Sequence, residues 1–278
     1  MRARPRGAPR GARNKKRTWS WSLLLVGVFL FFALVGPWIA PYSPEAIDLD
    51  HELALPSWAH WLGTADNGVD ILSVLLHGAR LAGEISICVV GISLLIGVPL
   101  GTLAGMRGGL TDHAVTGAAD LVQCFPAIVL QIAILALVAR PGIAHVVLAL
   151  SVTGWVLHAR VARAQALSLR EREFVVAARA LGASESRVLL RHVIPNLSGP
   201  IVVQATSALG GVILAESTLS FLGLGPGVAA SWGALLDQGA SVILRFPHVA
   251  LFAGGTLALT VLAFHLSGDW LRDRLDPK

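Results

Sequence analysis

The chain has 278 residues, of which 54% are hydrophobic and 14% are charged. Soluble domains carry about a quarter charged residues, so this composition excludes an ordinary soluble protein. Apolar stretches of roughly 20 residues, long enough to cross a bilayer, recur along the chain. The net charge of +5 does not indicate nucleic-acid binding, because Arg and Lys gather in a tail and a few loops, as membrane orientation requires. We therefore expect an all-α, multi-pass membrane protein.

The amino-terminal part contains a tail, one span and a polar segment. Residues 1–18 are rich in Arg and Lys and contain no acidic residue, which predicts a disordered, basic, cytoplasmic tail. Residues 19–79 contain a first span at about 21–40, followed by an acidic segment without Lys or Arg. The lack of positive charge places that segment outside the cell.

Residues 80–278 contain the remaining spans and form the main transmembrane domain. The apolar runs predict spans at about 81–106, 114–138, 143–158, 199–219 and 249–267. Pro126 is expected to kink the third span of the chain. Six spans with both termini in the cytoplasm satisfy the positive-charge rule at every loop.

An arginine-rich, polar stretch at 168–196 interrupts the apolar runs. Ser168 and Glu171 have the spacing of a capping box, which predicts a helix start. Three apolar residues then share one face of the predicted helix: Phe174, Ala178 and Leu181. We expect this face to insert into a groove of a partner protein, or alternatively to lie on lipid headgroups.

The predicted helix is followed by a turn and a second short helix. Gly182 stands where a left-handed cap is expected at the end of the first helix. The second helix is expected to run from about residue 184 until Pro195, which lacks a backbone donor. The stretch should therefore be a helix, a sharp glycine turn, and a helix that leads into the fifth span.

The sequence contains no motif for ATP binding or for covalent catalysis. A phosphate-binding loop needs Gly-Lys-Ser/Thr, and none of the three lysines, Lys15, Lys16 and Lys278, follows a glycine. We expect no enzymatic activity, no cofactor and no metal site in this chain. An alternative to a partner-driven transporter is an ion-coupled secondary transporter that uses Asp120 and Glu216, because acids inside spans are candidates for ion sites.

The stretch at 168–196 also resembles a family motif. Four of its residues stand at the places of the EAA loop of membrane subunits of ATP-binding-cassette importers: Ala177, Ala178, Gly182 and Pro195. Val176 occupies the position of the family's glutamate. The resemblance implies that this loop contacts a cytoplasmic ATPase.

Three further segments extend the resemblance over nearly the whole chain. They are HWLGTADNGVDILSVLLHGARLAGEIS at 60–86, AESTLSFLGLG at 215–225 with SWG at 231–233, and GDWLRDRLDPK at 268–278. Val69 replaces an arginine that is usual in the first segment. Together these segments are similar to the second permease subunit of dipeptide, oligopeptide and nickel importers.

The resemblance implies a type I ABC importer permease fold, similar to that of the methionine importer, in the bacterial inner membrane. The expected partners are membrane lipid, a second homologous permease that forms the other half of the pore, two cytoplasmic ATPases that hydrolyse ATP, and an extracytoplasmic solute-binding protein. No nucleic-acid partner is expected. The residues implied to couple to the ATPase are Phe174, Val176, Ala177, Ala178, Leu181, Gly182 and Pro195.

Overall fold

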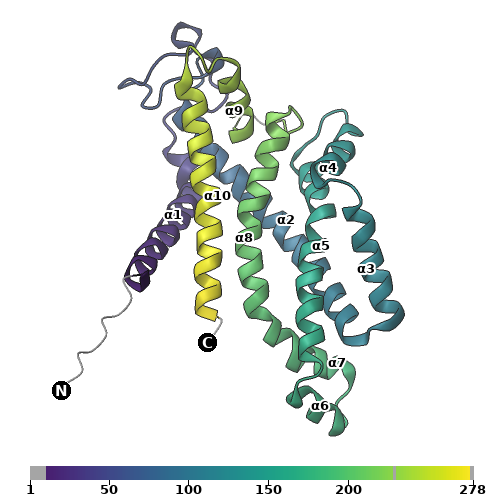
Figure 1. Ribbon diagram of the computed structural model, residues 1–278. Helices are drawn as coiled ribbons and strands as arrows, with labels where there is room; N and C mark the ends of the chain where they lie inside the picture. Colours follow the sequence, from purple (N-terminus) through teal and green to yellow (C-terminus); the bar gives the residue numbers. More distant parts are fainter. Residues whose placement is uncertain (1–10, 228–229, 276–278) are drawn as a thin grey trace, which may run out of the picture.

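The computed structural model describes residues 11–227 and 230–275, with side chains from residue 21 onward. Two 3₁₀ turns, Leu49–His51 and Asp66–Gly68, precede the second helix. The helices (Figure 1) are α1 (Gly11–Ile39), α2 (Ile71–Arg107), α3 (Gly109–Gln123), α4 (Ala127–Ala136), α5 (Ile143–Leu169), α6 (Glu173–Ala180), α7 (Glu185–Val188), α8 (Ile194–Phe221), α9 (Trp232–Ser241) and α10 (Pro247–Leu275).

The apolar helices confirm the predicted all-α membrane architecture. Among the described residues, five helices are long and apolar enough to cross a membrane: Trp21–Ile39, α2, α5, the continuous helix Glu185–Phe221 and α10. The pair α3 and α4 gives a sixth span if it is counted as one, with a bend of 78° between its helices. Pro126, expected to kink this span, is the N-cap residue of α4 and marks the bend.

Several helices are longer than the hydropathy of the sequence predicts. Helix α2 begins at Ile71 rather than near residue 81, and α5 continues to Leu169 rather than ending near residue 158. The apolar run marks only the part of a helix that fits the hydrocarbon layer, whereas backbone hydrogen bonding continues into polar sequence. Helix α1 begins at Gly11 and so includes residues 11–18 of the expected disordered tail, while residues 1–10 lie outside the described residues.

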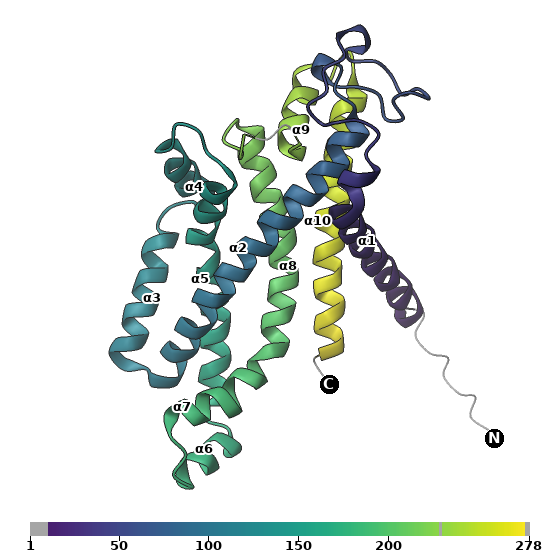
Figure 2. The same cartoon turned by 180° about the vertical axis from the view of Figure 1, so that it is seen from behind.

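The connections alternate between two ends of the molecule (Figures 1 and 2). Residues 40–70, the connection between α4 and α5, and α9 lie at one end, which we call the α9 end. The connection between α2 and α3 lies at the opposite end with α6 and α7, which we call the α6 end. The beginning of α1 and the end of α10 both point toward the α6 end. This alternation fits a bundle in which α3 and α4 together count as one crossing.

Helices α2 and α5 pack against each other through a row of glycines. Gly97, Gly101 and Gly105 recur every four residues, so they share one face of α2. A Cβ atom at each of them would overlap backbone atoms of α5, at Trp155, Ala159 and Arg163 respectively. Small residues with this spacing allow helix backbones to approach closely in a membrane.

Two ion pairs join α3 to α5. The guanidinium of Arg163 donates to both carboxylate oxygens of Asp112, with N–O distances of 2.5 and 2.6 Å. Further along, Arg160 donates to Asp120 at 2.7 Å. The paired residues are far apart in the sequence, so these contacts fix the position of α3 after the tight turn at Gly108.

The glycine row predicts that a valine substitution destabilises the protein at one glycine of α2 and is tolerated at another. Gly101→Val should reduce the yield of folded protein and lower its thermal unfolding midpoint, because overpacking typically costs about 1–3 kcal/mol. Gly91→Val is the matched control on the same helix, since a Cβ atom there meets nothing within 4 Å. The measurement is thermal unfolding of both purified variants in detergent. Equal unfolding midpoints would show that α2 and α5 do not pack through these glycines.

Candidate functional site

Helix α6 begins later than the capping pattern predicts. Ser168 lies in the last turn of α5, and Arg172, in extended conformation, is the N-cap residue of α6 without a side-chain capping bond. The expected capping box of Ser168 and Glu171 is therefore wrong. The reason is that α5 continues through the polar sequence to Leu169, which leaves a short connection of residues 170–172 before α6.

One face of α6 packs against its own chain. Val175 is fully buried and Ala178 is partly buried in a cluster formed by the ends of several helices. The other buried members of this cluster, which we call the α6 base, are Met106, Ala166, Val188, Val193 and Leu197. Ala178 therefore does not share an outward face with Phe174 and Leu181, as the helical pattern predicted, because it faces the base.

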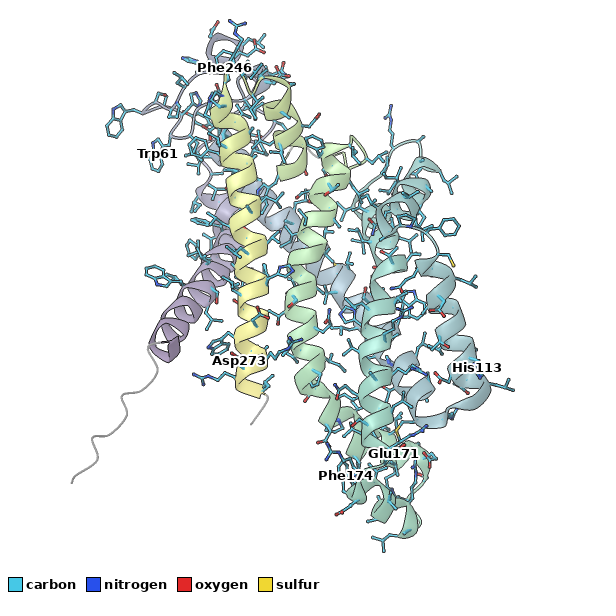
Figure 3. The ribbon with its side chains drawn as sticks, in the orientation of Figure 1. Trp61, His113, Glu171, Phe174, Phe246 and Asp273 are labelled. Atoms are coloured by element: carbon cyan, nitrogen blue, oxygen red, sulfur yellow. The ribbon has the colours of Figure 1, made fainter. Side chains whose placement is uncertain are left out.

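The opposite side of α6 presents apolar residues to the surroundings. Leu181 is 88% exposed, Val176 53% and Phe174 41%. Ala177 is also exposed. Figure 3 shows Phe174 and Glu171 at the α6 end of the molecule, opposite to Trp61 and Phe246. We call Phe174, Val176, Ala177 and Leu181 the exposed α6 surface.

A glycine turn ends α6, as the sequence predicted. Gly182 has φ +81°, a conformation that glycine adopts at no steric cost. The amide of Ala183 donates to the carbonyl of Ala178 at 3.0 Å and the amide of Gly182 to that of Arg179 at 2.9 Å, which is the Schellman arrangement. The guanidinium of Arg179 then spans the turn to both carboxylate oxygens of Glu185, at 2.8 and 3.1 Å.

Pro195 does not end the helix that follows the turn. Helix α7 continues through a π-helical turn, Leu189–Val193, into α8, and Pro195 lies in the first turn of α8. The expected break at Pro195 is therefore wrong. The π-helical turn directly before Pro195 interrupts the regular hydrogen-bond pattern of the helix, and the proline is accommodated next to this irregularity. Glu185–Phe221 is consequently one continuous helical segment.

The structure gives Asp120 and Glu216 separate partners. Asp120 pairs with Arg160 on α5. Glu216 is 2% exposed on α8 and accepts hydrogen bonds from Ser220 at 2.7 Å and Ser231 at 3.2 Å. Ser231 is the N-cap residue of α9, so Glu216 attaches α9 to α8. Both acids are engaged in helix packing within this chain.

The sequence pattern missed two structural features of the site. Val175 was not singled out, although its spacing of three residues from Ala178 marks a helical face. The ion pair of Arg179 and Glu185 crosses the turn at Gly182. The pair forms only because of the geometry of that turn, so sequence spacing alone could not identify it. The site contains no arrangement for covalent chemistry among the described residues; it is a projection that packs on the α6 base through Val175 and has an exposed apolar surface.

Comparisons with known proteins agree with this architecture. Residues 97–278 match the family described as "Binding-protein-dependent transport system inner membrane component", and residues 15–56 match the "N-terminal TM domain of oligopeptide transport permease C". The oligopeptide transport system permease protein OppC of Bacillus subtilis is 36% identical over 257 residues, which cover 92% of this chain and 84% of that protein. The dipeptide transport system permease protein DppC of Alkalihalophilus pseudofirmus is 36% identical with the same coverage.

Solved structures show the same fold at lower sequence similarity. A chain of the MetNI methionine ABC transporter in an inward-facing conformation matches with a TM-score of 0.61 and 18% identity, over 73% of this chain and 97% of that chain. The family match and the two permeases support an importer permease over an ion-coupled secondary transporter. The chain therefore belongs to the inner-membrane component family of binding-protein-dependent ABC importers, in its peptide-transport branch.

Proposed function

We propose that this chain forms half of the pore of an importer for dipeptides or oligopeptides and that the exposed α6 surface binds a cytoplasmic ATPase. The observation that carries the proposal is the pair of opposite faces on α6. One face is fixed to the α6 base through Val175, while the other leaves Phe174, Val176 and Leu181 exposed. An amphipathic helix with this arrangement suits a hydrophobic groove of a partner.

The position of α6 explains how such binding would move the membrane bundle. Helix α5 ends at Leu169, just before α6, and α7 leads without interruption into α8. The α6 base also contains Met106, the penultimate residue of α2. A displacement of α6 therefore acts on three membrane helices together. This is the rigid-body kind of switching that alternating access requires.

The remaining partners follow from the family and from the named relatives. A second homologous permease would complete the pore, two ATPases would hydrolyse ATP, and an extracytoplasmic binding protein would deliver the peptide. The α6 end would then face the cytoplasm, together with both termini, and the α9 end would face the binding protein. The Arg-rich sequence of the α6 end fits this orientation, since cytoplasmic loops carry an excess of positive charge.

A charge on the exposed α6 surface should prevent ATPase binding. Leu181→Asp should abolish co-purification of the ATPase subunits with the permease and reduce peptide uptake at least about tenfold, because an unpaired charge in an apolar interface is strongly unfavourable. The amount of permease in the membrane should not change, since Leu181 makes no part of the buried cluster. Immunoblotting of membranes and pull-down of the ATPase measure the two effects.

The matched control is Leu110→Asp, at the start of α3. Leu110 is 89% exposed and lies outside the exposed α6 surface, so this variant should retain the ATPase. Retention of the ATPase by Leu181→Asp would contradict the proposal. Lipid cross-linking at Leu181, without ATPase cross-linking, would instead place α6 on lipid headgroups.

The turn at Gly182 should tolerate residues according to their backbone preferences. Gly182→Pro should abolish uptake, because proline is restricted to φ near −65° and lacks the N–H that donates to Arg179. Gly182→Asn should retain most of the activity, because asparagine adopts the left-handed conformation readily and a Cβ atom there meets nothing within 4 Å. Uptake and ATPase co-purification distinguish the variants. Equal loss in both would mean that the turn requires more than its backbone geometry.

A further inference from the structure

Three potential metal ligands meet in the segment between α1 and α2. Asp48, His51 and His60 each offer a ligand atom, and these atoms all lie within 4.8 Å of one another. Asp48 and His51 are already in contact, with Oδ2 and Nδ1 2.9 Å apart. The rings of His51 and His60 have their centroids 5.7 Å apart. All three residues belong to the segment 40–70, which lies at the α9 end (Figure 1) and also contains Trp61 (Figure 3).

A buried carboxylate fixes the orientation of His60. Nδ1 of His60 lies 3.0 Å from Oδ1 of Asp70, and both side chains are buried. The other oxygen of Asp70 accepts from the amide and the hydroxyl of Ser73, at 2.8 and 2.7 Å. A carboxylate that only accepts requires Nδ1 of His60 to donate, so in the neutral ring Nε2 keeps its lone pair. Histidine ligands of metals are commonly held by a carboxylate in this way.

Neighbouring contacts restrict the His60 ring further. The ring of Tyr42 lies against it, with centroids 4.9 Å apart. The hydroxyl of Tyr42 donates to the carbonyl of Ala59 at 3.0 Å, and the backbone amide of Tyr42 donates to the hydroxyl of Ser73 at 3.1 Å. His60 is therefore a rigid member of the group, whereas the side chains of Asp48 and His51 are 44% and 58% exposed and free to adjust.

We infer that Asp48, His51 and His60 form a binding site for a divalent first-row transition metal such as zinc, with Asp70 as the positioning residue for His60. Two histidines and one carboxylate, with an open fourth position, are a known ligand set for zinc. Ligand atoms around tetrahedral zinc lie about 3.3 Å apart, given bonds of about 2.0 Å. The two exposed side chains can close the remaining distance by small rotations. The inference does not depend on the proposed function.

Metal binding here would join the loop to the start of α2. His51 is the last residue of the first 3₁₀ turn, Asp48 is the N-cap residue of that turn, and Asp70 is the N-cap residue of α2. The loop already packs closely. The hydroxyl of Thr64 donates to the carbonyl of His51, and the backbone amide of Asp48 donates to the carbonyl of Asn67 at 3.0 Å. A ligand that binds the folded state alone stabilises it. The metal would therefore stabilise the folded conformation of the segment 40–70 at the α9 end.

The test uses the full chain, purified in detergent with a tag that contains no histidine. Zinc chloride is titrated in competition with a chromophoric chelator, and thermal unfolding is measured with and without zinc. The wild-type chain should bind one zinc ion tightly and unfold at a higher temperature when zinc is present. His51→Ala and Asp48→Asn should each weaken binding at least about tenfold and remove the thermal shift, while both stay folded because these side chains are exposed.

The matched control is His113→Ala, which removes another exposed histidine at the α6 end. It should bind zinc like the wild type. The inference is overturned if the wild-type chain shows no binding at micromolar zinc. It is equally overturned if His51→Ala and Asp48→Asn bind zinc as tightly as His113→Ala does, since the zinc would then be bound elsewhere.

Discussion

The close packing of α2 on α5 is the contact on which the rest of the structure depends. The glycines of α2 let the two backbones approach until a single Cβ atom would not fit between them. Lipid gives no hydrophobic drive for helix association, so close van der Waals contact must stabilise this pair. The row of glycines ends next to Met106, which enters the α6 base together with Ala166 of α5. The same contact thus supplies the support on which α6 is held.

The two acids that an ion-coupled transporter would use both have partners within this chain. Asp120 and Asp112 pair with arginines of α5 and hold α3 beside it. Glu216 is surrounded by serine hydroxyls from α8 and from the start of α9. Polar groups inside a membrane need such partners, because an unsatisfied group costs several kcal/mol there. The position of an acid within a span is therefore insufficient to indicate ion transport.

Sequence reasoning identified the features that short stretches of sequence determine. The approximate positions of the spans follow from hydropathy, and the turn at Gly182 follows from the need for a positive φ. The outward face of α6 was misassigned because Ala178 packs against the α6 base. That cluster includes residues of α2, α5 and α8, which lie outside the stretch 168–196 from which the face was predicted. The proposed metal ligands were not identified from the sequence, for a similar reason. His60 joins Asp48 and His51 only because the loop folds back, and the 3₁₀ turns that allow this carry no apolar periodicity.

Helix α2 connects the two regions for which we make proposals. Its first turn is capped by Asp70, which also holds His60, and its last turn contributes Met106 to the α6 base. The helix is continuous from Ile71 to Arg107, and its close contacts with α5 lie on both sides of Pro99. Stiffening the α9 end would thus restrict the same helix that a displacement of α6 must move. The two proposed sites thus share one continuous helix, which is the physical connection that coupling between them would use.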